Sequence, residues 1–443
     1  MKNRMRNRRN KNRGVIHLSI ESTLPIYIII LSSMIIFRDV IGVNLSKYIF
    51  IVLCTFFFFI ADKQNLIYMT MFTVPMLCGL PGNYIMPITF FIYIIKKRYF
   101  QKKQFFFCLF IAFMEIFASV FYSSFDIPMI LGYVTNLMLF FCLIYDNSEY
   151  DYEKCLFYYT LGILLVSLVI VISTISKSPT WLEDIASGYL RFGMVEHETA
   201  EALNLTLNAN SLAMYSITGM SCCVVLLKGS FSKKIFIVSE IIFLALTGML
   251  TLSRTWIIIA IILFLLYFMA STTSIKQTLK TLLGIGVLLG ISFYILSKIP
   301  GVYEGMIARL TRADVAGGNG RVDITNEYLS LFGNNIRTML FGTGVTQYRS
   351  IIGAAESLHN SLVQILICYG IFGSFVFLYG WLSKPIKALR RVRLLYWIPF
   401  ICVLLFSLTL QIVNPHFLIY PHLMGIYALY LGMQENKKIS HII

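Results

Sequence analysis

Long apolar runs separated by short polar turns make up most of this chain. An α-helix needs about 20 consecutive apolar residues to cross the hydrocarbon core of a bilayer, and most of these runs approach that length. The pattern predicts an all-α polytopic membrane protein with about 12–14 transmembrane helices. The runs lie at 18–37, 48–61, 66–80, 84–95, 105–123, 129–145, 155–176, 206–227, 235–253, 255–271, 281–297, 358–380, 395–412 and 417–432.

The uncertainty in the number of spans comes from the runs 66–80 and 84–95. Both are short, they contain Pro75 and Pro87, and a Pro81-Gly82-Asn83 turn separates them. They form either two complete spans or one re-entrant hairpin that enters and leaves on the same side. Both alternatives leave the orientation of every other span unchanged.

Composition and charge agree with a membrane protein. The chain is 58% hydrophobic and 13% charged, with a mean hydropathy of +0.76. Its net charge of +16 resides largely in basic clusters between apolar runs, which is typical of topology signals and does not favour nucleic-acid binding. The clusters at 1–13, 96–103, 228–234 and 384–393 share one side if both termini are cytoplasmic, and we expect that orientation in the cytoplasmic membrane. The basic N-terminus resembles a signal-peptide n-region, but no cleavage motif follows, so we expect a retained first helix.

The cysteines suggest neither disulfides nor a metal site. All nine lie within or beside apolar runs, where they are expected to pack as small hydrophobic side chains with free thiols. The chain has no CxxC pair, no HExxH motif and no paired carboxylates of the DxD type. We therefore expect no bound metal and no cofactor.

Two long polar segments interrupt the apolar pattern, and both fall on the predicted outer face. We expect a single integral membrane domain, 1–443, with a first outer loop at 177–205 and a large extracytoplasmic loop at 298–357. Within the large loop, 301–312 and 322–333 have the residue spacing of short amphipathic helices at a membrane surface. A flexible loop that is amphipathic by chance is the alternative.

Two arginines at the outer face suit a bound anion. Arg254 lies in TLSRTW, at the turn between two apolar runs, and Arg321 follows a glycine-rich turn in GGNGRVDI. A guanidinium fork beside the N–H groups of a helix start is a plausible site for phosphate or diphosphate. Taken singly, Arg254 could instead reach lipid headgroups, and Arg321 could be an ordinary exposed loop residue.

A histidine and its neighbours suit proton transfer and sugar binding. His359 follows Glu356 by about one helical turn, so a carboxylate can orient the imidazole of a general base, and Asn360 comes next. A helix cap or interface residue is the alternative for His359. In the first outer loop, Arg191 precedes an Asn208-Ala209-Asn210 sequence, whose amides can cap a helix or meet sugar hydroxyls; capping is favoured for Asn208.

Two acidic residues, Glu115 and Glu240, lie inside apolar runs. Carboxylates at such positions are often functional and are the best argument for proton-coupled transport. Each could equally bridge a pair of helices through a hydrogen bond.

The order of these motifs resembles the bacterial O-antigen polymerase and O-antigen ligase superfamily. The resemblance covers about 191–381 and rests on R..G, NAN, SRT, GR, FGTG and HNSLVQILICYGIFG. It implies a GT-C-like fold in which Arg254 and Arg321 bind the diphosphate of an undecaprenyl-diphosphate donor and His359 lies near the acceptor hydroxyl. Arg191 would face the same cavity. One departure is Thr325, which occupies a position where the family often has an aromatic residue.

The resemblance implies a metal-independent glycosyltransferase, with inversion favoured, whose substrates are undecaprenyl-diphosphate-linked oligosaccharides in membrane lipid. A polymerase acting on lipid-linked repeat units is our first hypothesis, and a ligase acting on another acceptor is the second. A flippase and a chain-length regulator are possible partners. Hypotheses from other classes are a polysaccharide flippase or transporter, and a structural membrane subunit. Under the enzyme hypothesis, Glu356 and His359 are catalytic, Arg254 and Arg321 bind diphosphate, and Arg191, Asn210 and Asn360 bind substrate.

Overall fold

The computed structural model describes residues 20–410, except for 98, 123–125, 147–149, 187–190, 194–204, 206, 230–231, most of 272–319, 347, 355, 357 and 391–393. Over the described residues every regular element is a helix and there is no strand, as the apolar pattern predicts. The run 417–432, most of 281–297 and most of the expected surface helix at 301–312 lie outside the described residues.

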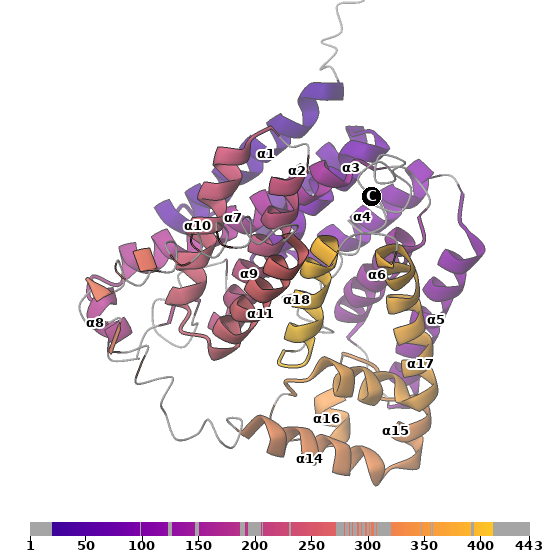
Figure 1. The fold of residues 1–443 in the computed structure, drawn as a ribbon. Helices are drawn as coiled ribbons and strands as arrows, with labels where there is room; N and C mark the ends of the chain where they lie inside the picture. Colours follow the sequence, from indigo (N-terminus) through magenta and orange to yellow (C-terminus); the bar gives the residue numbers. More distant parts are fainter. Residues whose placement is uncertain are drawn as a thin grey trace, which may run out of the picture.

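The helices follow the predicted runs closely (Figure 1). The larger departures are a short π-helix after α1, a 3₁₀ segment within the 66–80 run, and a start and end several residues later for the run predicted at 358–380. In chain order the elements are α1 (Ile20–Ile36), η1 (Phe37–Ile41), α2 (Lys47–Ile60), α3 (Lys63–Thr73), η2 (Val74–Cys78), α4 (Gly82–Lys97), α5 (Lys102–Phe121), α6 (Ile127–Ile144), α7 (Tyr152–Lys177), α8 (Trp181–Ala186), α9 (Ala209–Lys228), α10 (Lys234–Leu250), α11 (Arg254–Ser271), α14 (Arg321–Gly333), α15 (Ile336–Phe341), α16 (Tyr348–Ile352), α17 (Ser361–Leu389), η6 (Leu394–Trp397) and α18 (Ile398–Ser407).

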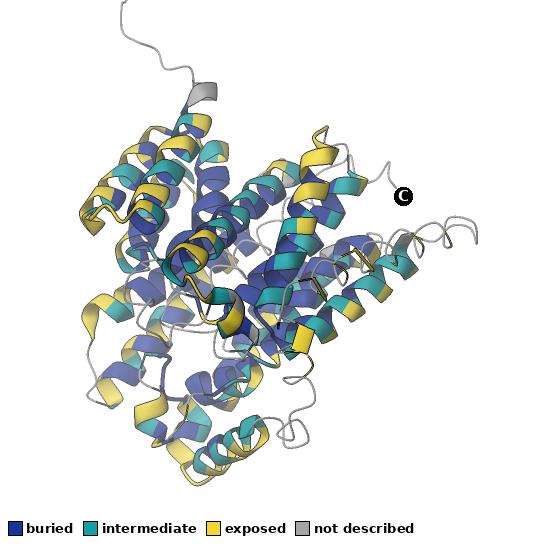
Figure 2. Ribbon diagram, turned by 90° about the vertical axis from the view of Figure 1, so that its left-hand side faces the viewer, coloured by how far each residue is buried: buried dark blue, intermediate teal, exposed yellow. Residues whose placement is uncertain are grey.

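The chain is a multi-pass membrane protein. Six helices within the described part are long and apolar enough to span a membrane, and shorter apolar helices accompany them. Large apolar side chains also cover the outer sides of the helices, and Phe375 of α17 is 80% exposed. Figure 2 shows such exposed positions in yellow, with buried positions on the inward sides of the helices. Apolar side chains on the outside are expected where lipid replaces water.

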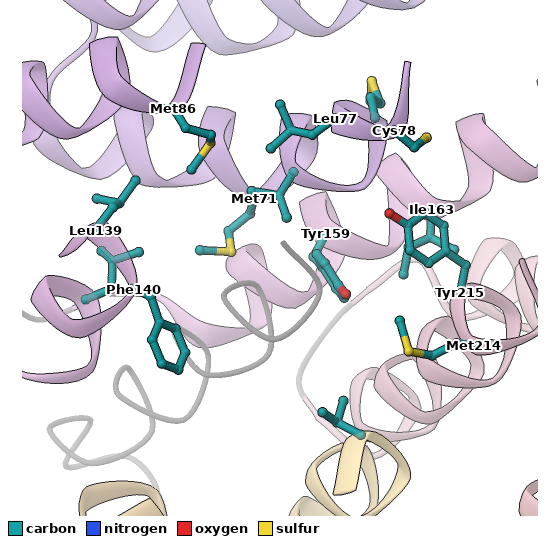
Figure 3. Packing of buried hydrophobic residues seen from close by; sticks show 14 of the residues in the cluster. Met71, Leu77, Cys78, Met86, Leu139, Phe140, Tyr159, Ile163, Met214 and Tyr215 are labelled. Carbon is teal, nitrogen blue, oxygen red and sulfur yellow. The ribbon is translucent and has the colours of Figure 1, made fainter. Parts of the chain in front are cut away.

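The proline-rich runs form a closely packed pair of helices. α3 continues into η2, the chain turns at Gly79–Pro81, and α4 returns, with nearly all of α3 and η2 buried. Both α3 and η2 pack against α7. Figure 3 shows part of this core, in which Met71 and Leu77 lie near Tyr159 of α7. This packing buries Leu80 at the turn, whereas Gly79 and Pro81 stay partly exposed.

A buried ion pair holds the turn against the end of α1. Arg38 and Asp39 lie in η1 and form a two-pronged pair, Nε to Oδ1 at 3.0 Å and Nη2 to Oδ2 at 2.8 Å. The remaining nitrogen, Nη1, donates to the Gly79 carbonyl at 2.9 Å. Since both side chains are at most 6% exposed, neither charge relies on water.

The polar segments after α11 gather at one end of the molecule. α14, α15 and α16 lie together at the lower end of Figure 1, beneath α9, α11 and α18. α14 confirms the helix predicted at 322–333, and it buries Tyr328 and Phe332. This end carries the residues that the sequence singles out.

Candidate functional site

Arg191 and Phe192, from the segment between α8 and α9, contact the turn between α10 and α11. Arg191 donates from Nε to the Thr251 carbonyl at 2.9 Å and from Nη2 to Oδ1 of Asn210 at 3.3 Å. The next residue, Phe192, donates its backbone N–H to the Leu250 carbonyl at 3.3 Å. The guanidinium of Arg191 is therefore held by two elements that are far apart in the sequence.

Asn210 is the common acceptor of this first group. Its Oδ1 also accepts from the hydroxyl of Ser253 at 3.1 Å, which ties the first turn of α9 to the residue before Arg254. The turn itself is tight, because Leu252 has φ of 49°, a conformation that branched or bulky L-residues rarely adopt. Arg254 then begins α11 and is partly exposed. The structure thus brings Arg191, Asn210 and the SRT turn together.

The second group forms where α14 begins and α17 begins. Arg321 is the first residue of α14 and is partly buried. Thr325, which occupies the position where an aromatic residue was expected, donates its hydroxyl to the Arg321 carbonyl at 2.7 Å. Burial lowers the pKa of Arg321 from its ordinary value of 12.5, and the guanidinium still keeps its charge at neutral pH.

His359 lies within electrostatic reach of Arg321 and Glu356. Burial lowers the pKa of His359 from its ordinary value of 6.5, and the positive charge of Arg321 lowers it further. The carboxylate of Glu356, which is exposed, acts in the opposite direction and raises that pKa. The net effect favours a neutral imidazole at neutral pH, the form that can accept a proton.

Two tyrosines fix the backbone just before His359. Tyr328 of α14 donates its hydroxyl to the Glu356 carbonyl at 2.8 Å, and its ring packs against Tyr348 of α16 with centroids 6.1 Å apart. Both hydroxyls also make a hydrogen bond with the backbone of Leu358. The residues on the N-terminal side of His359 are therefore anchored to α14 and α16.

The asparagines in the two motifs cap helices. Asn360 accepts from the backbone N–H groups of Leu362 at 3.0 Å and Val363 at 3.2 Å, which caps α17. Asn208 accepts from the Ser211 N–H at 2.8 Å and caps α9, as predicted. A contact between Asn360 and substrate therefore stays a prediction.

A known family matches the part of the chain that contains the second group and the Arg254 turn. Residues 241–378 match the family described as O-Antigen ligase, which is just under a third of the chain. These residues are an O-antigen ligase family domain. A search of curated proteins finds no match to the chain.

The O-antigen ligase domain contains Arg254, Arg321, Glu356, His359 and Asn360, whereas Arg191 and Asn210 lie before it. The family covers ligases and polymerases that transfer lipid-linked glycans, so its members are glycosyltransferase-like membrane proteins of polysaccharide biosynthesis. Lipid-linked glycans are the substrates that this family implies. The family resemblance noted in the sequence is confirmed.

α18 joins the scaffolds of the two groups. It packs against α9 and α11, the helices that begin beside Asn210 and at Arg254 (Figure 1). Just beyond its C-terminal end, the Leu410 carbonyl accepts from the hydroxyl of Ser361 at 2.5 Å, two residues after His359. One helix of the bundle thus links the arginine turn to the histidine loop.

A break in the helical backbone of α17 was not predicted from the sequence. Gly370 has φ of 65° and interrupts the helix, and Gly342, with φ of 75°, lies directly against it. A Cβ on either glycine would collide with backbone atoms of the other segment. Glycine on both sides of the contact, in FGTG and in YGIFG, is the signal that could have revealed it.

Proposed function

We propose that the chain is a polymerase that transfers undecaprenyl-diphosphate-linked glycan onto another lipid-linked repeat unit. The observation that carries the proposal is the proximity of Arg321 and His359, which come from distant segments of the O-antigen ligase domain. A diphosphate needs a fixed cation, and an attacking hydroxyl needs a neutral base. Arg321 and His359 supply these roles within reach of each other's electrostatic field.

The reaction that follows is a single displacement. The acceptor hydroxyl oxygen forms a bond to the anomeric carbon of the donor while the bond from that carbon to the diphosphate oxygen breaks. His359 takes the hydroxyl proton, and undecaprenyl diphosphate leaves with the electron pair. Attack opposite the leaving group inverts the anomeric configuration.

Arginines stabilise the charge that develops on the leaving group. In this proposal the leaving diphosphate is bound by Arg321, the first residue of α14, and by Arg254, the first residue of α11. Donors that are already oriented before the reaction stabilise such charge without reorganisation. Arg191, fixed by Thr251 and Asn210, orients the donor glycan beside them.

The reaction takes place at the outer face of the cytoplasmic membrane, with both termini in the cytoplasm. The basic clusters at 96–103, 228–234 and 384–393 support this orientation, because Lys and Arg favour cytoplasmic loops. In this arrangement the two polar loops, 177–205 and 298–357, cover the site from outside. A flippase would deliver the donor, and a chain-length regulator would limit the product.

Two other functions, a ligase and a transporter, make different predictions for the same residues. A ligase would use the same donor and the same residues but transfer finished glycan to another kind of acceptor. A transporter would instead require polar residues at the membrane midplane that line an alternating cavity. Arg254, Arg321 and His359 lie at helix starts or in the adjoining loop, which favours an enzyme.

The test is the size distribution of lipid-linked and surface glycan in cells whose only copy carries Arg321→Ala or His359→Ala. Accumulation of single lipid-linked repeat units, with protein abundance unchanged on a blot, is the expected result. Accumulation of long lipid-linked chains would assign the ligase function instead. An unchanged glycan pattern would overturn the enzyme proposal.

Arg337→Ala is the matched control for Arg321→Ala. Arg337 is another arginine of the large outer loop; it is exposed on α15, and its guanidinium lies over the ring of Phe121, 5.8 Å from the centroid. Its replacement should leave chain length within the normal range. Equal loss in both variants would mean that the loop needs positive charge in general and not Arg321 in particular.

A further inference from the structure

A carboxylate from the N-terminal half of the chain contacts the large outer loop. Glu115 lies in α5 and is fully buried. Its two oxygens lie 3.3 Å and 3.1 Å from the backbone nitrogen of Val345, which donates to them. Val345 directly follows the FGTG sequence, 230 residues away from Glu115.

The loop beside Glu115 fills the break in α17. Because Gly370 is not helical, the carbonyls of Ile367 and Cys368 lose their usual partners within the helix. The N–H groups of Thr343 and Gly344 replace those partners, at 3.0 Å and 2.9 Å. The loop and the broken helix therefore complete each other's backbone hydrogen bonding.

Glu115 also contacts α17 itself, at the residue directly before the break. The hydroxyl of Tyr369 makes a hydrogen bond with the Glu115 carboxylate, and it lies 2.9 Å from the hydroxyl of Tyr133 in α6. A single carboxylate thus joins α5, α17 and the FGTG loop. A buried carboxylate with several donors around it is well suited to hold such elements in fixed positions.

Direct contacts continue from this point to the histidine. Val345 is followed by Tyr348 at the start of α16, whose ring packs on Tyr328. Both tyrosines bond the backbone of Leu358, the residue before His359. Val345 is therefore three residues along the chain from Tyr348, whose hydroxyl bonds the backbone of Leu358.

We propose that Glu115 is a positioning residue for the glycan-transfer site, acting through the FGTG loop to place His359. The inference rests on the proposed function, because the position of His359 affects a measurable rate only if the protein catalyses glycan transfer. Glu115 itself contacts no substrate. Its role is to keep the histidine loop at the distance from the acceptor that proton transfer requires.

The test compares Glu115→Leu, Glu115→Gln and Glu240→Leu in the full-length protein, purified in lipid nanodiscs. Glutamine keeps an oxygen that accepts the Val345 N–H, whereas leucine does not. Glu240 is a matched control, because it is another buried carboxylate in a helix of the bundle, α10. Hydrogen exchange of the segments 342–348 and 356–360 is measured together with transfer of glycan between lipid-linked repeat units.

In Glu115→Leu the backbone amides of both segments should exchange hydrogen faster than in the wild type. The kcat of transfer should fall by about 100-fold, while KM should change far less, because a small misplacement of a catalytic group has an effect of that size. Glu115→Gln should restore both measurements, and Glu240→Leu should alter neither. Unchanged exchange in Glu115→Leu would overturn the inference, as would normal kcat despite faster exchange. Equal loss in Glu115→Gln would also overturn it, by making the negative charge the essential feature.

The two proposals fail in different ways. A wild-type protein without transfer activity, tested on several lipid-linked acceptors, would refute the proposed function. Faster exchange at 356–360 in Glu115→Leu would still establish that Glu115 positions the histidine loop. Wild-type activity combined with an inert Glu115→Leu substitution would refute only the positioning role.

Discussion

Oδ1 of Asn210 lies 3.3 Å from Nη2 of Arg191 and accepts its hydrogen bond. The contact fixes an arginine from the first outer loop against the first turn of α9, and Ser253 shares the same acceptor. A guanidinium with few accessible orientations loses less entropy when it binds a ligand. The hydrogen bonds of Arg191 to Thr251 and Asn210 therefore orient its guanidinium in advance of the substrate binding that we propose.

Asn210→Leu should weaken substrate binding more than it slows the chemical step. The bond to the charged Arg191 contributes about 1.5 kcal/mol, so its loss should raise KM by roughly 10-fold. Steady-state kinetics with a lipid-linked repeat unit measure the effect. Asn208→Asp is the control, since it keeps the α9 cap, and it should leave KM near the wild-type value. A fall in kcat with unchanged KM would contradict this role of Arg191.

Glu356→Gln should move the acid limb of the pH–rate profile to lower pH. In the proposed mechanism His359 acts as a neutral base, so activity should fall as the pH drops through the pKa of His359. Glu356 raises that pKa, and glutamine removes the charge responsible, so the pKa decreases. Activity at neutral pH should remain within about 10-fold, whereas His359→Ala should lose about 10²- to 10⁴-fold.

Glu327→Gln provides the control for this shift. Glu327 lies in α14 of the same loop and interacts with Tyr328. Its replacement should leave the acid limb in place. A limb that shifts upward in Glu356→Gln, or equally in both variants, would exclude Glu356 as the neighbour that raises the pKa of His359.

Gly370→Ala should destabilise the protein more than Gly353→Ala does. Both glycines have positive φ, 65° and 79°, which costs an L-residue about 1–2 kcal/mol. At Gly353 a Cβ would meet open space, but at Gly370 it would collide with the backbone of the Leu340–Gly342 segment. Thermal unfolding in detergent should show the larger fall in Tm for Gly370→Ala. Equal Tm values would mean that the loop separates from α17 at little cost.

Asp39→Ala should sharply reduce the amount of folded protein. It leaves the Arg38 guanidinium buried without its carboxylate, a change that typically costs about 3–5 kcal/mol. The double variant Arg38→Met/Asp39→Leu removes both charges and should recover much of the loss. Fluorescence-detected size-exclusion chromatography of membrane extracts compares the three proteins. Equal loss in the single and double variants would show that the pair itself is not the cause.

The sequence predicted the helices well because each apolar run carries its own signal. The turn at Arg254, the helix at 322–333 and the cap at Asn208 depend on neighbours within a few residues, and all three are confirmed. The resemblance to the family likewise rests on short motifs, each of which can be recognised from a few neighbouring residues.

Contacts between distant segments left no such local signal. Nothing in the spacing of Glu115 indicates that it meets Val345. The apolar pattern around Gly370 is that of a continuous helix, and only the glycines of FGTG and YGIFG together point to the break. The same is true of Tyr328 and Tyr348, which matter because their hydroxyls form hydrogen bonds with the backbone of Glu356 and Leu358. Hydrophobic periodicity reports which face is apolar, but not which backbone group a side chain will meet.

The bond between Glu115 and Val345 also constrains how the protein is made. α5 leaves the ribosome long before the FGTG loop, so its carboxylate enters the bilayer before the Val345 N–H exists. A charged or unpaired carboxyl group among lipid tails is unfavourable, which makes early release of α5 into open lipid costly. The first helices must therefore stay sheltered, by the insertion machinery or by one another, until the second half of the chain closes over them.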